Sequence, residues 1–133
     1  MTTVQRVAQI FGIVFLVVAL YGFTQTGMSN MESDPARAPQ LLGLFAVNVL
    51  HNVVHLLFGI WGLVASRTFS GAKSYAQIAG VLYLILAVAG FIVPNGFGLV
   101  PLGGNDVWLH LVLGLVLAGV GFTARELRPP VVA

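Results

Sequence analysis

Four polar side chains lie within one apolar stretch of the sequence, NVLHNVVHLLFG. They are Asn48, His51, Asn52 and His55, and their i, i+3, i+4, i+7 spacing puts them on one face of a helix. Imidazole nitrogens bind metal ions and haem iron, and carboxamides both donate and accept hydrogen bonds. The spacing therefore indicates one of three roles for this face: a hydrogen-bonded network, a ligand set, or a path for protons or small ions.

The third histidine of the chain, His110, lies in a later apolar stretch and could join the first two. His51 and His55 at i, i+4 with His110 would supply three imidazoles to a divalent metal. Alternatively, His110 and one of the pair would hold a haem or a chlorophyll-like pigment between two helices. The H-x-x-x-H spacing is a weak metal signal without the glutamate of H-E-x-x-H, so these cofactors stay candidates only.

Asn105 and Asp106 stand where the last apolar stretch begins, and they complete the polar cluster. We expect Asp106 to be the N-cap of that helix, accepting from free backbone N–H groups. The less favoured alternative is that Asp106 faces the histidines. No nucleophile stands beside a base and an orienting acid, so the sequence does not predict an enzyme.

The composition predicts an integral membrane protein. Of 133 residues, 58% are hydrophobic and only 8% are charged, and the mean hydropathy is +0.96. The chain has no cysteine, which excludes disulfides and thiolate metal sites. Its net charge of +2 comes from scattered residues, which excludes a nucleic-acid-binding surface.

Four apolar segments are long enough to cross a bilayer, which takes about 20 residues. We place these spans at residues 7–26, 41–66, 75–93 and 107–124, and expect Ser74 to cap the third. The predicted fold is an all-α, four-helix membrane bundle that forms a single transmembrane domain over residues 1–133.

Basic residues set the orientation, because Lys and Arg are retained on the cytoplasmic side. All but Arg37 fall on the side of the two termini, whereas Glu32 and Asp34 fall on the other side. Both termini are therefore expected in the cytoplasm of a bacterium, with the protein in the inner membrane. Counted from the basic anchors, His51 and His110 lie at one level, about 22–24 Å away at 1.5 Å per residue. The basic residues on the terminal side are Arg6, Arg67, Lys73, Arg125 and Arg128.

The sequence contains an internal repeat. AQIFGIVFLVVALYGF, residues 8–23, and AQIAGVLYLILAVAGF, residues 76–91, are identical at half of their positions without a gap, and HLLFG is repeated later as HLVLG. The chain is thus predicted to be two copies of one helical hairpin, with the copies running in the same direction. Small residues at four-residue spacing let helices approach closely in lipid. The positions expected at helix contacts are Ala8, Gly12, Gly59, Ala76, Gly80 and Gly114.

Three sequence segments together resemble those of a known protein family. NVLHNVVHLLFGIWGLVASR, YAQIAGVLYLILAVAGF and NDVWLHLVLG resemble the bacterial membrane-protein family of domain of unknown function 4383, over roughly Arg6 to Arg125. The resemblance implies a four-span bacterial inner-membrane protein and no assigned activity. The motif positions fall on Asn48, His51, Asn52, His55, Gly59, His110 and Gly114.

The favoured function is a non-enzymatic membrane protein that acts through helix association, as a structural or accessory subunit. Its expected partners are the lipid bilayer and either a larger membrane complex or further copies of the chain. Haem, pigment or metal binding through His51 or His55 with His110 is the first alternative. A small ion or proton pathway in an oligomer is the second.

Overall fold

The computed structural model describes residues 1–127, and Arg128 lies outside them. Four helices dominate the chain, so the predicted all-α four-helix fold is confirmed. Between them lie two two-residue strands and one short 3-10 helix. The elements are α1 (Thr3–Thr26), β1 (Gln40–Leu41), β2 (Phe45–Ala46), α2 (Val49–Ala65), α3 (Phe69–Ile92), η1 (Gly96–Gly98) and α4 (Asn105–Thr123).

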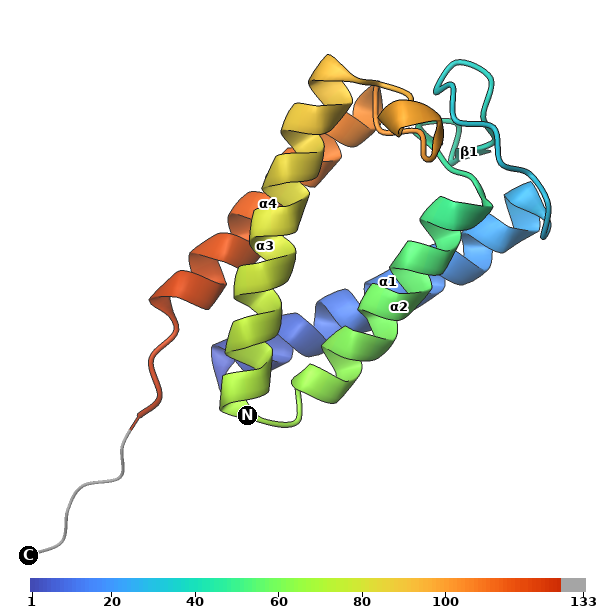
Figure 1. The fold of residues 1–133 in the computed structure, drawn as a ribbon. Coiled ribbons are helices and arrows are strands. Elements are labelled where there is room, and N and C mark those ends of the chain that lie inside the picture. The colour runs from blue at the N-terminus through green and yellow to red at the C-terminus, as the bar shows by residue number, and fades with distance from the viewer. Residues whose placement is uncertain (128–133) are drawn as a thin grey trace, which may run out of the picture.

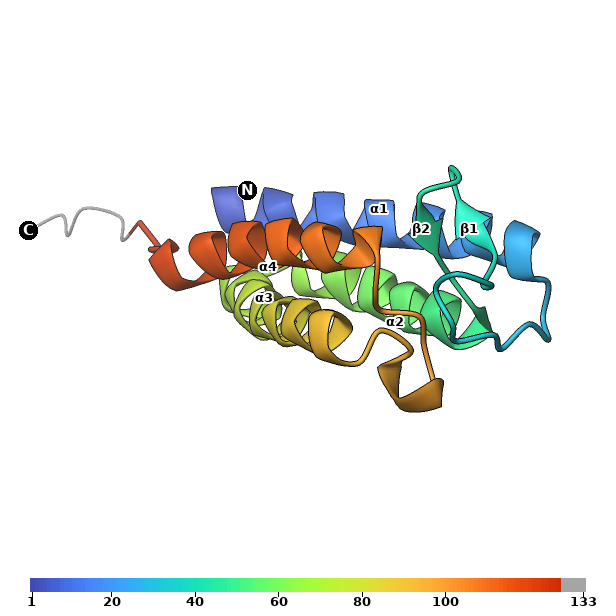
Figure 2. The ribbon, with the colours of Figure 1, turned by 90° about the horizontal axis from the view of Figure 1, so that it is seen from above.

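The helices form two hairpins, α1 with α2 and α3 with α4. The hairpins meet at the end that holds the α2–α3 connection and diverge toward the opposite end (Figure 1). Seen from above, α1 and α4 lie in one layer, and α2 and α3 lie in the other (Figure 2). The helices α1, α3 and α4 are long and apolar enough to cross a membrane.

The second helix is shorter than the predicted span 41–66. It begins at Val49, is 17 residues long, and is capped by Asn48, whose side chain accepts from the backbone N–H of His51. The residues before it form the antiparallel pair of β1 and β2, in which Gln40 faces Ala46. Hydropathy could not distinguish this segment from a helix, because apolar residues are needed wherever water is excluded, in protein or in lipid.

The third and fourth helices also begin differently from the prediction. Thr68, not Ser74, caps α3, and its hydroxyl accepts from the N–H of Gly71, so the polar FSGAKS segment is helical. Gly104, not Asp106, is the N-cap of α4, with a positive φ of 66° that favours glycine. Asp106 lies inside the first turn, where its side chain is buried.

Small residues lie where the two helices of each hairpin touch. A Cβ at Gly12 would lie 2.8 Å from the backbone nitrogen of Leu63, and one at Gly59 would lie 2.9 Å from that of Leu16. In the second hairpin, a Cβ at Gly114 would lie 2.9 Å from the nitrogen of Leu84. Gly80 has no room for a Cβ beside the backbone of α4, and the remaining small positions, Ala8 and Ala76, are fully buried. These contacts hold each hairpin together through close backbone approach.

Three contacts link the diverging ends of the hairpins. Nδ2 of Asn48 donates to the carbonyl of Leu99 at 2.8 Å, and Nδ2 of Asn105 donates to the carbonyl of Leu44 at 3.0 Å. The ring of Phe45 packs on that of Trp108, with centroids 5.6 Å apart. The β1–β2 segment therefore covers the gap between the first and second hairpins at this end.

Candidate functional site: an apolar cavity with a polar end

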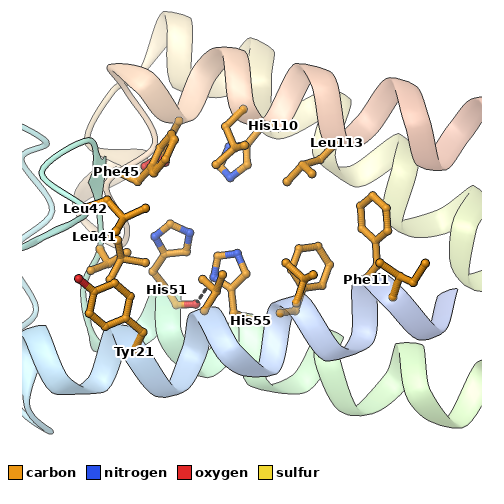
Figure 3. A pocket seen from close by; sticks show the side chains of 16 residues that line it. Phe11, Tyr21, Leu41, Leu42, Phe45, His51, His55, His110 and Leu113 are labelled. Carbon is orange, nitrogen blue, oxygen red and sulfur yellow. Dashed lines mark hydrogen bonds between the residues drawn. The ribbon is translucent and has the colours of Figure 1, made fainter. Parts of the chain in front are cut away.

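A cavity of about 390 Å³ lies between the two hairpins, beneath the β1–β2 segment. Its volume is within the range of about 300–1,000 Å³ typical of small-molecule sites. Its walls come from α1, the segment around β1 and β2, α2 and α4, and Figure 3 shows the side chains that point into it. The cavity is open on the side of the α1 and α4 layer, where Ile10, Val14 and Tyr21 are 57%, 46% and 41% exposed.

Most of the cavity is lined by aliphatic and aromatic side chains, and its His and Asp residues come from two walls, α2 and α4; this group is called the polar end below. The apolar lining residues are Ile10, Phe11, Val14, Phe15, Val18, Leu41, Leu42, Phe45, Val47, Leu109 and Leu113, with Tyr21 at the rim. The polar end consists of His51 and His55 from α2 and Asp106 and His110 from α4.

The two histidines of α2 each use Nδ1 for a hydrogen bond to a backbone carbonyl. Nδ1 of His51 lies 3.2 Å from the carbonyl oxygen of Ala46, and Nδ1 of His55 lies 3.1 Å from that of His51. A carbonyl oxygen only accepts, so Nδ1 carries the proton in both rings. The rings pack against each other with centroids 4.5 Å apart. Two positive charges at that separation would repel each other, so at least one ring is neutral and presents Nε2 as an acceptor.

The opposite wall supplies His110 and Asp106, each 2% exposed. The His110 ring faces the α2 histidines (Figure 3), with its centroid 6.2 Å from that of His51. Within the described residues, neither Nδ1 of His110 nor Oδ2 of Asp106 has a hydrogen-bond partner. Buried polar atoms are nearly always paired, so two unpaired atoms on residues that line one cavity require an explanation.

The predicted polar stripe of α2 divides into different roles in the structure. His51 and His55 face the cavity, whereas Asn48 caps α2 and binds the carbonyl of Leu99. Asn52 is fully buried against α1, where its Nδ2 donates to Oγ1 of Thr26 at 2.9 Å. Asn105 lies apart from the histidines, on the exposed surface, where its Oδ1 accepts from the indole N–H of Trp108.

Within residues 1–127, no group of three His, Asp or Glu side chains is placed to hold an ion. The α2 histidines each have one nitrogen engaged with the backbone, which leaves one per ring to face the cavity.

Sequence reasoning missed two parts of the site, the segment of residues 41–47 and the aromatic pair Phe15 and Tyr83. Leu42 and Gly43, with φ of 54° and 66°, make the turn between β1 and β2. Gly43 was the sequence signal that could have indicated an interruption of the predicted span 41–66. The aromatic pair was visible in the repeat itself, because Phe15 and Tyr83 occupy the same position in the two copies.

Comparison with known proteins gives a family and no function. No curated protein and no solved structure matches the chain. The match to DUF4383, a domain of unknown function, covers residues 5–123, which includes all four helices except the first two residues of α1. The chain therefore belongs to the DUF4383 family of domains of unknown function.

Proposed function

We propose that this chain is a four-span protein of the bacterial inner membrane, with both termini in the cytoplasm. Support comes from its outer surface, where apolar side chains on every helix are about half exposed or more. Such a surface is suited to lipid and would associate in water. Examples from the four helices in turn are Val17, Leu57, Ile85 and Leu115.

The ends of the bundle differ in charge, and this supports the proposed orientation. The basic residues Arg6, Arg67 and Lys73 lie at the end where the hairpins meet, whereas Glu32 and Asp34 lie in the connection at the diverging end. The short α2, about 26 Å long at 1.5 Å per residue, nearly matches a hydrocarbon core of about 30 Å. The apolar β1–β2 segment extends it toward the outer face.

The function we infer is non-enzymatic binding of a small amphipathic molecule from the membrane, in the cavity between the hairpins. One observation carries this inference: Asp106 and His110 line an otherwise apolar cavity, and among residues 1–127 each has a buried polar atom without a hydrogen-bond partner, Oδ2 of Asp106 and Nδ1 of His110. A ligand with a polar end and an apolar body would satisfy both parts of the cavity. Among the described residues, the lining has no Ser, Thr, Cys or Lys side chain, which removes the hydroxyl, thiol and amine nucleophiles of covalent catalysis.

Entry from the membrane follows from the position of the opening. The cavity opens between α1 and α4, along the lengths of two helices, and its rim residues Ile10 and Val14 are apolar. An apolar molecule dissolved in the bilayer would therefore reach the cavity without crossing water. The β1–β2 segment would close the cavity on the outer side.

Haem or a chlorophyll-like pigment is a second candidate, favoured by the facing rings of His51 and His110 on separate helices. The cavity volume is near the lower limit for a small-molecule site, which favours a ligand smaller than a macrocycle. The outer surface would also serve helix association in a larger complex, although the small residues predicted for helix contacts lie inside the hairpins.

The test is to identify what the purified protein carries. The protein is isolated from bacterial membranes in mild detergent, its visible spectrum and metal content are recorded, and a solvent extract is analysed by mass spectrometry. The expected result is a colourless protein enriched in one amphipathic compound, retained by Phe122→Leu on the outer surface and lost from His110→Phe. A Soret or pigment band that His110→Phe abolishes would replace this proposal with the second candidate. Bulk phospholipid alone, in equal amounts in all variants, would overturn ligand binding.

A further inference from the structure

We propose that the polar end of the ligand is a phenolic hydroxyl that donates a hydrogen bond to the histidine and aspartate end of the cavity. This inference rests on the proposed function, because it names the chemical class of the molecule bound there. Three features of the cavity favour a phenol: its unpaired polar atoms accept hydrogen bonds, its apolar lining disfavours a charged ligand, and aromatic side chains form part of its walls.

The free polar atoms of the α2 wall are acceptors. Both Nδ1–H groups of His51 and His55 are donated to backbone carbonyls, so Nε2 is the nitrogen left for a ligand. No hydrogen bond to Nε2 of either ring occurs among the described residues. In a neutral ring this nitrogen accepts, so the α2 wall favours a ligand that donates.

The α4 wall adds a second acceptor. Oδ2 of Asp106 is buried and has no protein partner among residues 1–127, and a carboxyl oxygen that carries no proton only accepts. A hydroxyl between the two walls could donate to one of these acceptors. Because the hydroxyl oxygen also accepts, it would in addition suit His110 when Nδ1 of that ring carries the proton. A carbonyl or an ether, which only accepts, would leave the α2 acceptors and Asp106 unpaired.

A neutral donor suits the rest of the cavity better than a charged one. Apart from the four residues of the polar end, the lining is aliphatic or aromatic, and burial of an ammonium in such surroundings is costly. An alcohol brings a donor without a charge. A hydroxyl is therefore the favoured polar group of the ligand, and an alkylammonium is the competing occupant that the experiment must exclude.

Aromatic walls favour a ring next to that hydroxyl. Phe11, Phe15 and Phe45 line the cavity, and Phe15 already stacks on Tyr83 behind it. Aromatic rings pack favourably on one another in edge-to-face or offset arrangements. The apolar opening between α1 and α4 then leaves room for an alkyl or isoprenoid tail to extend into the bilayer.

The test compares matched probes that differ in one group. Binding of para-heptylphenol, its methyl ether para-heptylanisole and para-heptylbenzylamine is measured by calorimetry on the full-length protein in nanodiscs. An isoprenoid hydroquinone and a tocopherol-type phenol, run in parallel, distinguish two natural sources of the phenol group. The variants are His51→Phe, Asp106→Leu and the outer-surface control Phe122→Leu.

We expect the phenol to bind roughly tenfold more tightly than its methyl ether, the ratio that one buried hydrogen bond of about 1.4 kcal/mol provides. Both cavity variants should reduce that ratio toward one, and Phe122→Leu should keep it. Equal binding of phenol and ether would overturn the hydroxyl assignment while leaving a ligand cavity in place. Tighter binding of the amine would also overturn it, in favour of a cation. Binding of none of the probes, with no compound in the extract, would overturn the proposed function itself.

Discussion

The ring of Phe15 in α1 stacks on the ring of Tyr83 in α3, with centroids 5.5 Å apart and planes inclined by 23°. The two residues are equivalent in the repeat, so this is a contact between the same position of two copies, as a two-fold relation produces. Each ring also packs on the histidine of its own hairpin, with centroids 5.4 Å apart for Phe15 and His55 and 5.2 Å apart for Tyr83 and His110. The duplication thus builds the site, because it brings one histidine from each copy to the same pair of rings.

The central pair should be sensitive to loss of its ring and insensitive to loss of its hydroxyl. Phe15 is 2% exposed, so Phe15→Ala should lower the free energy of unfolding by about 3–5 kcal/mol. Tyr83→Phe makes the two copies alike and should cost little, because no hydrogen bond of that hydroxyl occurs among the described residues. Unfolding in detergent, followed by circular dichroism, measures both. Equal losses in the two variants would contradict the importance of the ring contact.

The close approach of α3 and α4 predicts opposite effects for two glycines. A Cβ at Gly80 would collide with the backbone of Ala118, so Gly80→Ala should force the helices apart and cost about 1–3 kcal/mol. Gly119, on the exposed face of α4, has nothing within 4 Å of the added carbon. Gly119→Ala should leave stability unchanged or raise it by up to about 1 kcal/mol, because alanine favours helix. Thermal unfolding of both variants in one detergent makes the comparison, and a tolerated Gly80→Ala would show that the helices can separate.

Asn48 should matter more than Asn52, although both are fully buried on the same helix. Asn48→Ala removes two interactions, the N-cap of α2 and the hydrogen bond to the carbonyl of Leu99 that joins the two hairpins. The cap alone contributes about 0.5–2 kcal/mol to stability. Asn52→Ala removes one bond to Thr26, and such bonds in membranes are worth about 0.6 kcal/mol on average. Hydrogen exchange should show faster exchange at the start of α2 in Asn48→Ala only. If Asn52→Ala costs more, its contact with α1 is the stronger link.

Asp106 should lower the stability of the ligand-free protein. Its Oδ2 is buried without a partner among residues 1–127, so Asp106→Leu should raise the free energy of unfolding by about 1–3 kcal/mol after removal of bound ligand. Asp106→Asn keeps a buried polar group and should gain little, which makes it the matched control. The measurement is unfolding in detergent before and after solvent extraction. A loss of stability in Asp106→Leu would mean that the carboxylate has a stabilising partner within the protein.

The proposed orientation can be tested without background substitutions, because the chain has no cysteine. Ser29 and Ser70 are exposed, the first after α1 and the second at the start of α3. In intact spheroplasts, a membrane-impermeant maleimide should label Ser29→Cys at once and Ser70→Cys only after permeabilisation. The reverse pattern would invert the topology and place the histidines in the cytoplasmic half of the bilayer.

The sequence by itself determined the helical fold, the pairing of helices and the repeat. Apolar length, small residues such as Gly12 and Gly80, and the two copies of one hairpin all follow from local composition and spacing, which a single chain displays directly. It also singled out His51, His55 and His110, because polar groups in apolar helices must turn away from lipid.

Only the tertiary structure decided what each polar residue faces. Asn48, Asn52 and His55 share one helical stripe, yet they face a loop, α1 and the cavity, since the neighbours of a helix surface depend on how the two hairpins diverge. The divergence of the hairpins also places Asp106 in the lining of the cavity, although the sequence predicted a helix cap at that position. It lets residues 41–47 form the β1–β2 segment over the histidines, where the sequence predicted a continuation of the second helix. Helical periodicity fixes the direction of a side chain within its own helix, and the packing of separate helices fixes what it meets.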